Sequence, residues 1–368
     1  MRMILKGYAP YSVPPPGYRQ PCRTRQAAIS ACAMARKVLG LLHVVRLLPL
    51  QRVDPPVKKG ILFLALLFLA VSAPAWALDC VLLQSSPLKP YEEARQGFEQ
   101  AWLGQRPLSG PKSIGGNTVT QVLLSGQQAT DTFPLKKQLQ AAGLVVAIGD
   151  QALEFARELR EVPVVYLLAP SARALSKNFF GIEMRIQPSR QLAAINKALP
   201  KVRSIGVLYN PAHSGQWVQE ALLSPVASVQ TLLFKKFDSQ TNVPGALQEL
   251  AGKVDAYWLL PDPQLTAPQV FGSILEFSMK NSVPVISFSE KYLARGAAVA
   301  VTFDTVDMGR QAAELGAHVV RDGLGGDVPV LTPPRKIRVV ANPTVLDRLG
   351  VPYAPQAIDA SYTPETGR

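Results

Sequence analysis

Short apolar runs alternate with longer segments of helical spacing along most of the chain. The runs are rich in Val, Ile, Leu and aromatic residues, which is typical of buried parallel strands. We predict strands at residues 80–84, 119–124, 144–148, 164–168, 204–209, 229–234, 256–260, 283–287, 298–303 and 337–341. Helices are predicted at residues 90–102, 133–142, 150–159, 188–199, 215–222, 244–252, 267–281 and 306–321. This alternation predicts an α/β fold.

The predicted strands fall into two groups, one before Pro170 and one between residues 204 and 287. Because β-α-β crossovers are right-handed and place helices on both faces of a sheet, each group predicts its own layer. The expected architecture is two doubly wound parallel-sheet lobes joined by a hinge. Residues 78–184 with part of 298–330 are expected in lobe 1, 185–297 with part of 331–355 in lobe 2, and 356–368 in a flexible tail.

A signal-like segment precedes the first predicted strand. Lys58 and Lys59 lead into an apolar stretch that ends in the small-residue sequence Ala75-Trp76-Ala77. These are the three parts of a secretory signal peptide, so residues 58–77 predict export. The alternative is an uncleaved membrane anchor. Residues 1–57 are basic and proline-containing, and they are expected to be a disordered extension or not to be translated.

The formal net charge of +13 is concentrated near the N-terminus. Residues 78–368 carry 28 Lys plus Arg and 25 Asp plus Glu, which leaves no basic footprint for nucleic acid. Cys80 is the one cysteine of that region, so it predicts neither an internal disulfide nor a zinc site. No phosphate-binding loop or dinucleotide fingerprint is visible, and no cofactor is expected.

Polar, amide-rich and hydroxyl-rich loops follow the predicted strands, where ligands bind in open α/β sheets. Hydroxyls and free N–H groups at a helix start favour a carboxylate or another anion. Asp262 is a candidate partner for an ammonium group, although a Pro-Asp-Pro turn needs no ligand. Asp304 is interpreted as a helix cap or as a ligand contact. The candidate ligand-binding residues are Ser85, Ser86, Tyr91, Gly149, Asp150, Gln151, Asn210, Ser214, Asp262 and Asp304.

Material for catalysis is sparse, and we expect no catalytic residues. His213 and His318 are the histidines after the signal-like segment, and His318 lies inside a predicted helix. A hydrolase would require Ser86, Ser171 or Ser214 to lie within hydrogen-bond reach of His213. Adjacency in sequence does not establish such a pair.

Several segments resemble a known family. The sequence RQLAAINKALPKVRSIGVLYNP at residues 190–211 is similar to the middle of ABC-transporter substrate-binding proteins of the aromatic-amino-acid type. Residues 246–256, 283–287 and 295–311 agree with it. The family usually has a Gly-Thr turn where this chain has Gly149-Asp150, and an acid at Asp150 would repel a ligand carboxylate.

This resemblance implies a periplasmic-binding fold of type I, in which a monomer passes a small solute to an inner-membrane permease. The leading hypothesis is a periplasmic receptor of an ABC importer that binds an amino acid or another small polar molecule. An extracytoplasmic sensor that partners a signalling protein is the alternative, followed by an exported α/β hydrolase.

Overall fold

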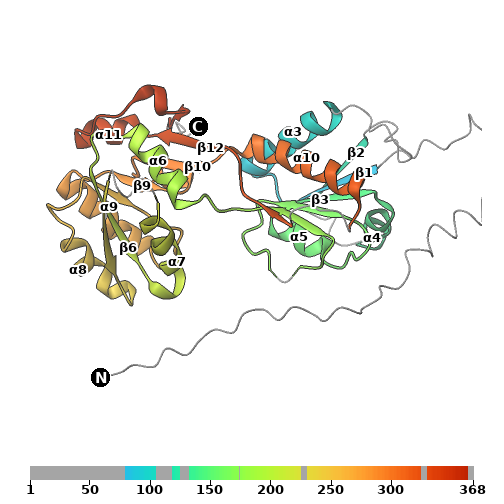
Figure 1. The fold of residues 1–368 in the computed structure, drawn as a ribbon, viewed down its shortest axis with the longest axis horizontal. Helices are drawn as coiled ribbons and strands as arrows, with labels where there is room; N and C mark the ends of the chain where they lie inside the picture. The colour runs from blue at the N-terminus through green and yellow to red at the C-terminus, as the bar shows by residue number, and fades with distance from the viewer. Residues whose placement is uncertain are drawn as a thin grey trace, which may run out of the picture. The chain divides into compact units, whose positions relative to one another are not determined.

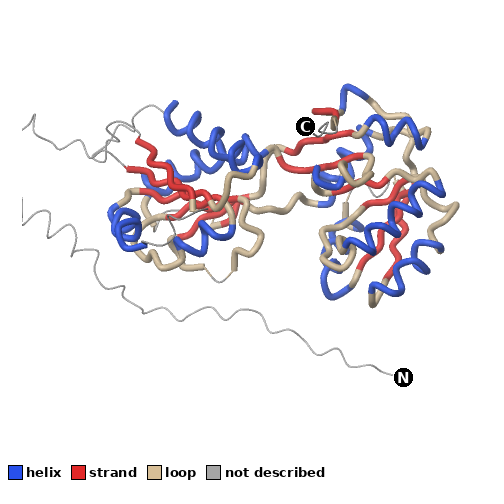
Figure 2. Tube along the Cα trace, turned by 180° about the vertical axis from the view of Figure 1, so that it is seen from behind, coloured by secondary structure: helices blue, strands red, loops and turns tan. Residues whose placement is uncertain are grey.

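The computed structural model describes residues 79–104, 118–124, 132–173, 175–224, 230–324 and 330–363, all within one compact unit. The predicted signal segment and residues 1–57 lie outside the described residues. Two separate sheets organise the described part of the chain, as predicted (Figures 1 and 2).

Six parallel strands form the sheet of lobe 1, in the order β11-β5-β4-β3-β1-β2. Four helices pack on this sheet and complete lobe 1. The strands are β1 (Asp79–Gln84), β2 (Thr118–Leu123), β3 (Leu144–Ile148), β4 (Val164–Leu167), β5 (Phe179–Ile182) and β11 (Leu331–Thr332). The helices are α3 (Lys89–Gly104), α4 (Thr132–Ala141), α5 (Asp150–Ala156) and α10 (Thr305–Asp322).

Side chains on the two faces of this sheet belong to different cores because successive strand residues point in opposite directions. Cys80 and Leu82 of β1 lie in a cluster with residues of α3 and α10. Val81 and Leu83 lie in the opposite cluster with residues of α4 and α5. Lobe 1 is therefore doubly wound, with α3 and α10 side by side on one face (Figure 1).

Two glycines allow α3 and α10 to approach closely. A Cβ added at Gly97 would lie 2.0 Å from the Val306 carbonyl oxygen, and one added at Gly309 would lie 1.9 Å from the Ala94 carbonyl oxygen. Backbone atoms cannot yield as a flexible side chain can, so these positions require glycine. The crossing fixes α10 on a sheet whose strands come mostly from much earlier in the chain.

Seven strands form the sheet of lobe 2, in the order β13-β12-β10-β9-β8-β6-β7, and only the β10–β12 pair is antiparallel. The strands are β6 (Ser204–Tyr209), β7 (Thr231–Lys236), β8 (Ala256–Trp258), β9 (Val285–Ser287), β10 (Val299–Phe303), β12 (Ile337–Ala341) and β13 (Ala360–Ser361). The helices are α6 (Pro188–Ala198), α7 (Pro211–Leu222), α8 (Val243–Gln248), α9 (Pro268–Asn281) and α11 (Pro343–Leu349).

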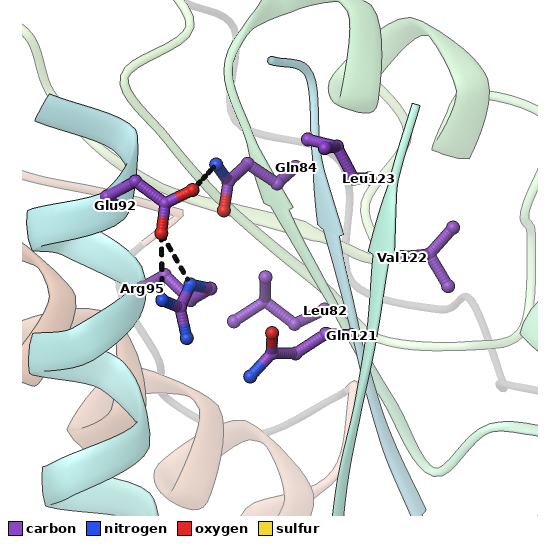
Figure 3. Close-up of a pocket in the computed structure, with 7 residues that line it drawn as sticks. All are labelled: Leu82, Gln84, Glu92, Arg95, Gln121, Val122 and Leu123. Carbon is purple, nitrogen blue, oxygen red and sulfur yellow. Dashed lines mark hydrogen bonds and ion pairs between the residues drawn. The ribbon is translucent and has the colours of Figure 1, made fainter. Parts of the chain in front are cut away.

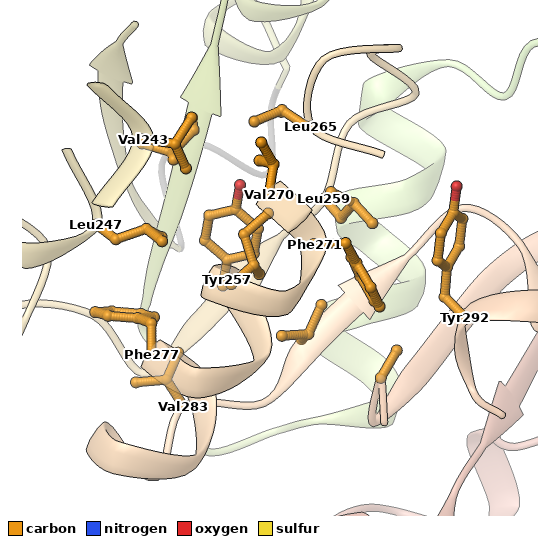
Figure 4. Packing of buried hydrophobic residues seen from close by; sticks show 14 of the residues in the cluster. Val243, Leu247, Tyr257, Leu259, Leu265, Val270, Phe271, Phe277, Val283 and Tyr292 are labelled. Carbon is orange, nitrogen blue, oxygen red and sulfur yellow. The ribbon is translucent and has the colours of Figure 1, made fainter. Parts of the chain in front are cut away.

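Helices also cover both faces of the sheet in lobe 2. On one face, Tyr257 of β8 packs in a cluster with Val243 and Leu247 of α8 and with Phe271 and Phe277 of α9 (Figure 4). On the other face, the cluster contains residues of α6, α7 and α11. The predicted fold class, two doubly wound α/β lobes, is confirmed.

The chain passes between the two lobes three times. The first crossing, residues 183–187, joins β5 to α6; the second, at Asp304, joins β10 to α10; and the third, residues 333–336, joins β11 to β12. Each lobe is therefore assembled from segments that are far apart in the sequence.

Some predicted elements were wrong in position or missing. The helix expected to start at residue 215 begins at Pro211, because Asn210 caps it and proline suits the first turn. Strands β5, β11 and β13 and helix α11 were not predicted. Residues 356–363 are no tail, because β13 pairs with β12 and Tyr362 packs on the core of lobe 2.

Candidate functional site

Ser85, directly after β1, connects three elements of lobe 1. Its side-chain hydroxyl donates to the carbonyl of Ile148 at the end of β3 (2.9 Å) and accepts from the N–H of Ala152 in α5 (2.9 Å). Ser85 is buried, and its backbone N–H also donates to Ile148. The hydroxyl therefore holds the ends of β1 and β3 against the start of α5.

Gly149 packs closely against Ser85 and the ring of Tyr91. It precedes α5 with a φ of 90°, a conformation that glycine adopts readily. A Cβ here would lie 2.6 Å from Ser85 Oγ and 2.9 Å from the Tyr91 ring. Burial, followed by the negative charge of Asp150, raises the pKa of Tyr91, which keeps this half-buried phenol protonated. The result is a neutral aromatic hydroxyl beside the first turn of α5.

Asp150 joins the loops that follow β3 and β4. Its carboxylate accepts hydrogen bonds from the N–H (2.9 Å) and the hydroxyl (3.1 Å) of Ser171. Just before this loop, Leu168 has a φ of 54°, an uncommon conformation for a residue with a branched side chain. The Asp150 carboxylate is thus directed at Ser171. Predicted residues Ser86 and Gln151 lie beside these groups in sequence, partly exposed and exposed respectively.

Four polar side chains form one network at the strand ends of lobe 2. Asn210 caps α7 through a bond from the N–H of Ala212 (2.9 Å), and its amide donates to Gln264 Oε1 (3.0 Å). Ser214 donates to Asp262 Oδ2 (2.9 Å), and the other carboxylate oxygen accepts from the Gln264 N–H (2.9 Å).

Asp262 is 1% exposed, so its charge is sheltered inside this network. A buried carboxylate is stabilised by such bonds, and removal of a partner leaves an unsatisfied charge. The loop after β8 is therefore fixed to the first turn of α7. Groups of the protein itself supply hydrogen bonds to both carboxylate oxygens of Asp262. Its role toward a ligand ammonium group stays a prediction.

Asp304 caps helix α10. Its carboxylate accepts from the Asp307 N–H (2.9 Å), as in a standard N-cap. The neighbouring Thr305 hydroxyl donates to Glu93 of α3, which ties the start of α10 to lobe 1. The cap interpretation is supported by this geometry, and the ligand contact stays a prediction.

The predicted residues thus fall into two sets, one per lobe. Ser85, Tyr91, Gly149 and Asp150 meet at the strand ends of lobe 1, whereas Asn210, Ser214 and Asp262 meet at those of lobe 2. Sequence reasoning did not include Ser171 or Gln264 among the candidate ligand-binding residues, although both lie in loops that follow strands. Their hydrogen-bond partners, 21 and 54 residues away in the chain, carry no local signal.

A cavity of about 240 Å³ lies between α3 and the strands β1 and β2 (Figure 3). Gln84, adjacent to Ser85, donates to the Ser86 carbonyl (2.8 Å) and to Glu92 (2.7 Å), while Arg95 pairs with Glu92 (2.8 Å). Hydrogen bonds from Gln84 and Arg95 hold the pKa of Glu92 below its ordinary value. None of the ten predicted residues lines this cavity, which is lined by Leu82, Gln84, Glu92, Arg95, Gln121, Val122 and Leu123.

Two of the three serines that a hydrolase could use have other partners. Ser214 donates to Asp262, and Ser171 bonds to Asp150. His213 is exposed and makes no hydrogen bond to either serine within the part of the chain that the structure describes. Among the described residues, neither Ser171 nor Ser214 therefore has the nucleophile–base contact of a triad.

Residues 136–361 match the family model described as ABC transporter substrate binding protein. The chain belongs to this family. The resemblance drawn from residues 190–211 is thereby confirmed. None of the helices in the described part of this substrate-binding protein is both long and apolar enough to cross a bilayer.

Individual proteins similar to this substrate-binding protein have low sequence identity. A tyrosine-binding protein of Clostridioides difficile is 25% identical over 172 residues, 46% of this chain and 49% of the relative. The chain therefore spans about half the length of that curated relative.

Two solved structures add to this comparison. The ligand-free, open structure of a substrate binding protein with adhesive properties from Clostridium difficile aligns with a TM-score of 0.58 at 17% identity, covering 78% of this chain and 99% of that chain. An ABC domain in complex with L-Trp from Streptococcus pneumonia aligns with a TM-score of 0.48 at 18% identity, covering 78% and 100%. The first of these likenesses shows the fold alone.

Proposed function

We propose that this protein is the exported receptor of an ABC importer, and that it binds an amino acid or another small polar molecule without changing it chemically. The observation that carries the proposal is the match of residues 136–361 to the substrate-binding family. The polar groups gathered at the strand ends of both lobes support it, because open α/β sheets bind ligands there.

In this proposal, the ten predicted residues have two roles: some contact the ligand, and the others position the loops. Ser86, Tyr91 and Gln151 contact the ligand, together with the backbone at Gly149. The remaining residues hold the loops in place: Ser85, Asp150, Asn210, Ser214, Asp262 and Asp304 are engaged with partners in the protein. Pre-organised groups of this kind reduce the ordering penalty of binding.

Asp150 does not exclude an amino acid as the ligand. Its carboxylate keeps its charge but is held toward Ser171 by two hydrogen bonds, and an amino acid also carries an ammonium group that this charge would attract. Nearby, Tyr91 supplies an aromatic face and a protonated hydroxyl. The name of the Clostridioides difficile relative, a tyrosine-binding protein, makes aromatic amino acids the first candidates to test.

Calorimetric titration of the full chain with the standard amino acids, purines and small organic acids tests this function. We expect stoichiometric binding of one ligand class, and mass spectrometry should recover the ligand unchanged. Tyr91→Leu should weaken that binding by about tenfold or more, since it removes an amphipathic aromatic contact. Ser273→Ala, on α9, is the matched control because its hydroxyl contacts only its own helix. Chemical turnover of any compound would refute a pure receptor.

Export and import need separate measurements. We propose that residues 58–77 are removed during export to the periplasm, so N-terminal sequencing of protein from that fraction should begin near Leu78. Deletion of the gene should abolish uptake of the radiolabelled ligand if the partner is a permease. Normal uptake with a lost transcriptional response would favour the sensor alternative.

A further inference from the structure

The first crossing segment is held by lobe 1 at one end and by lobe 2 at the other. The N–H of Glu183 donates to the Thr332 carbonyl of β11 in lobe 1 (2.8 Å). Three residues later, the carbonyl of Ile186 accepts from Gln191 Nε2 of α6 in lobe 2 (3.0 Å). Met184 and Arg185 lie between these two bonds.

A closed ring of contacts holds the lobe 2 end. Gln191 Oε1 accepts from the indole N–H of Trp258 (3.1 Å), and Trp258 packs edge to face with Trp217 at 6.3 Å between ring centroids. The Arg185 guanidinium lies 5.2 Å from the centre of the Trp217 ring, which is cation–π geometry. Because Arg185 is followed by Ile186, whose carbonyl binds Gln191, the ring is complete.

We call the residues Arg185, Ile186, Gln191, Trp217 and Trp258 the hinge ring. Gln191 and Trp258 are 2% and 1% exposed, so their hydrogen bond is shielded from water. An ion pair adds to the ring from outside, since Arg185 Nη2 lies 2.6 Å from Glu220 Oε2. Both side chains of this pair are about one third exposed or less, which limits its screening by solvent.

Helix α7 brings the hinge ring and the candidate site together. Asn210 caps this helix and Ser214 lies in its first turn, where both join the network around Asp262. Trp217 comes three residues after Ser214, and Glu220 comes six residues after it. Both therefore lie within the next two turns of the same helix. A shift of the first turn of α7 therefore moves the side chains that hold Arg185.

Met184 packs against the core of lobe 1, next to the Glu183 bond. We propose that the hinge ring fixes Arg185 and Ile186 to lobe 2, so that the first crossing bends between Met184 and Arg185. Arg185 is then a positioning residue that couples α7 to the crossing. The coupling to ligand rests on the proposed function. The location of the bend does not.

Limited trypsin digestion of the ligand-free full chain tests the ring itself. Trypsin must take an arginine side chain into its specificity pocket, and Arg185 is held by Trp217 and Glu220. Glu220→Gln should speed cleavage after Arg185 by about fivefold or more, because it removes the ion pair that restrains the side chain. The matched control is Glu154→Gln, which removes the surface ion pair with Arg157 in lobe 1 and should leave cleavage after Arg185 unchanged.

Ligand kinetics test the coupling, with L-tyrosine as the probe. Arg185→Met should raise the dissociation rate by about fivefold while the association rate changes by less than about twofold, since a loosened crossing leaves the closed complex less well ordered. Arg185→Lys should restore much of the native rate, and Arg157→Met should have no effect. Circular dichroism should show an unchanged melting temperature, which separates positioning from general destabilisation.

The outcomes are distinct. Equal cleavage after Arg185 in the native chain and in Glu220→Gln would overturn the ring. Accelerated cleavage with an unchanged dissociation rate would overturn the coupling and keep the bend. If the native chain fails to bind L-tyrosine, the proposed ligand class fails, and the trypsin result still tests the hinge ring on which the position of the bend depends.

Discussion

Replacement of Gly149 by alanine tests the close packing of this residue in the candidate site of lobe 1. The backbone there has a φ of 90°, which an L-residue with a Cβ adopts only under strain. The new methyl group would lie 2.6 Å from Ser85 Oγ and 2.9 Å from the Tyr91 ring, both inside van der Waals contact. The substitution therefore acts on the backbone and on two candidate site residues.

The magnitude follows from these contacts. A residue with a Cβ in this conformation costs about 1–2 kcal/mol. Displacement of the Ser85 hydroxyl weakens its bonds to Ile148 and Ala152, each worth about 1 kcal/mol. The free energy of unfolding should fall by about 3 kcal/mol, which corresponds to roughly 5 °C in melting temperature for the unit that spans Ala75–Arg368. Ligand affinity should fall with it, because the Tyr91 ring moves.

Urea unfolding followed by circular dichroism measures the stability change, and calorimetry measures the affinity. Gly272→Ala is the control, since a Cβ there meets nothing within 4 Å and the residue lies inside α9. That control should stabilise the protein by up to about 1 kcal/mol, because alanine favours a helix over glycine. A Gly149→Ala protein with native stability and native affinity would refute the close packing of Gly149 against Ser85 and Tyr91.

Three further predictions concern other elements. Gly309→Ala should lower the free energy of unfolding by about 2–3 kcal/mol, because its Cβ would overlap the backbone of α3, and thermal unfolding measures this. Asp304→Ala should reduce it by about 1 kcal/mol through loss of the α10 cap, and unchanged ligand affinity would exclude a direct contact. Burial would raise the pKa of Asp255, but hydrogen bonds from Arg203 and Ser204 outweigh it and lower that pKa. The ionised Asp255 therefore stabilises the folded protein by about 0.5–1 kcal/mol after solvent screening. This contribution is present above about pH 4 and is lost as the pH falls through the lower pKa of the folded state. Asp255→Asn should destabilise the protein at pH 7 and be nearly neutral at pH 2, as measured by urea unfolding.

Local patterns predicted most of the fold. The buried runs that became β1, β3 and β4 needed only their apolar composition, and Asp304 was recognisable as a cap from its place before an amphipathic helix. Strand β5 is as short as β4, but its four residues include Gly181, and glycine is unfavourable in strands. Its pairing with β4 depends on the whole sheet, so it could not be read from its own segment.

The candidate site shows the same division. Loops after strands could be located, because strand ends are visible in the sequence. The partners of their side chains could not, because Ser85 reaches Ile148 across 63 residues and Ser214 reaches Asp262 across 48. These pairs meet because of the order of the strands within each sheet, which the sequence of a single segment does not encode.

The late arrival of α10 has a consequence for how lobe 1 matures. Its cluster contains Phe98 and Trp102 from α3, yet Met308 and Ala312, which cover them, come more than two hundred residues later. When only the first 300 residues have been synthesised, this face of the sheet can be covered by α3 but not yet by α10. The apolar side chains that α10 buries therefore stay uncovered until residues 305–322 have been made, and lobe 1 completes its core only near the end of synthesis.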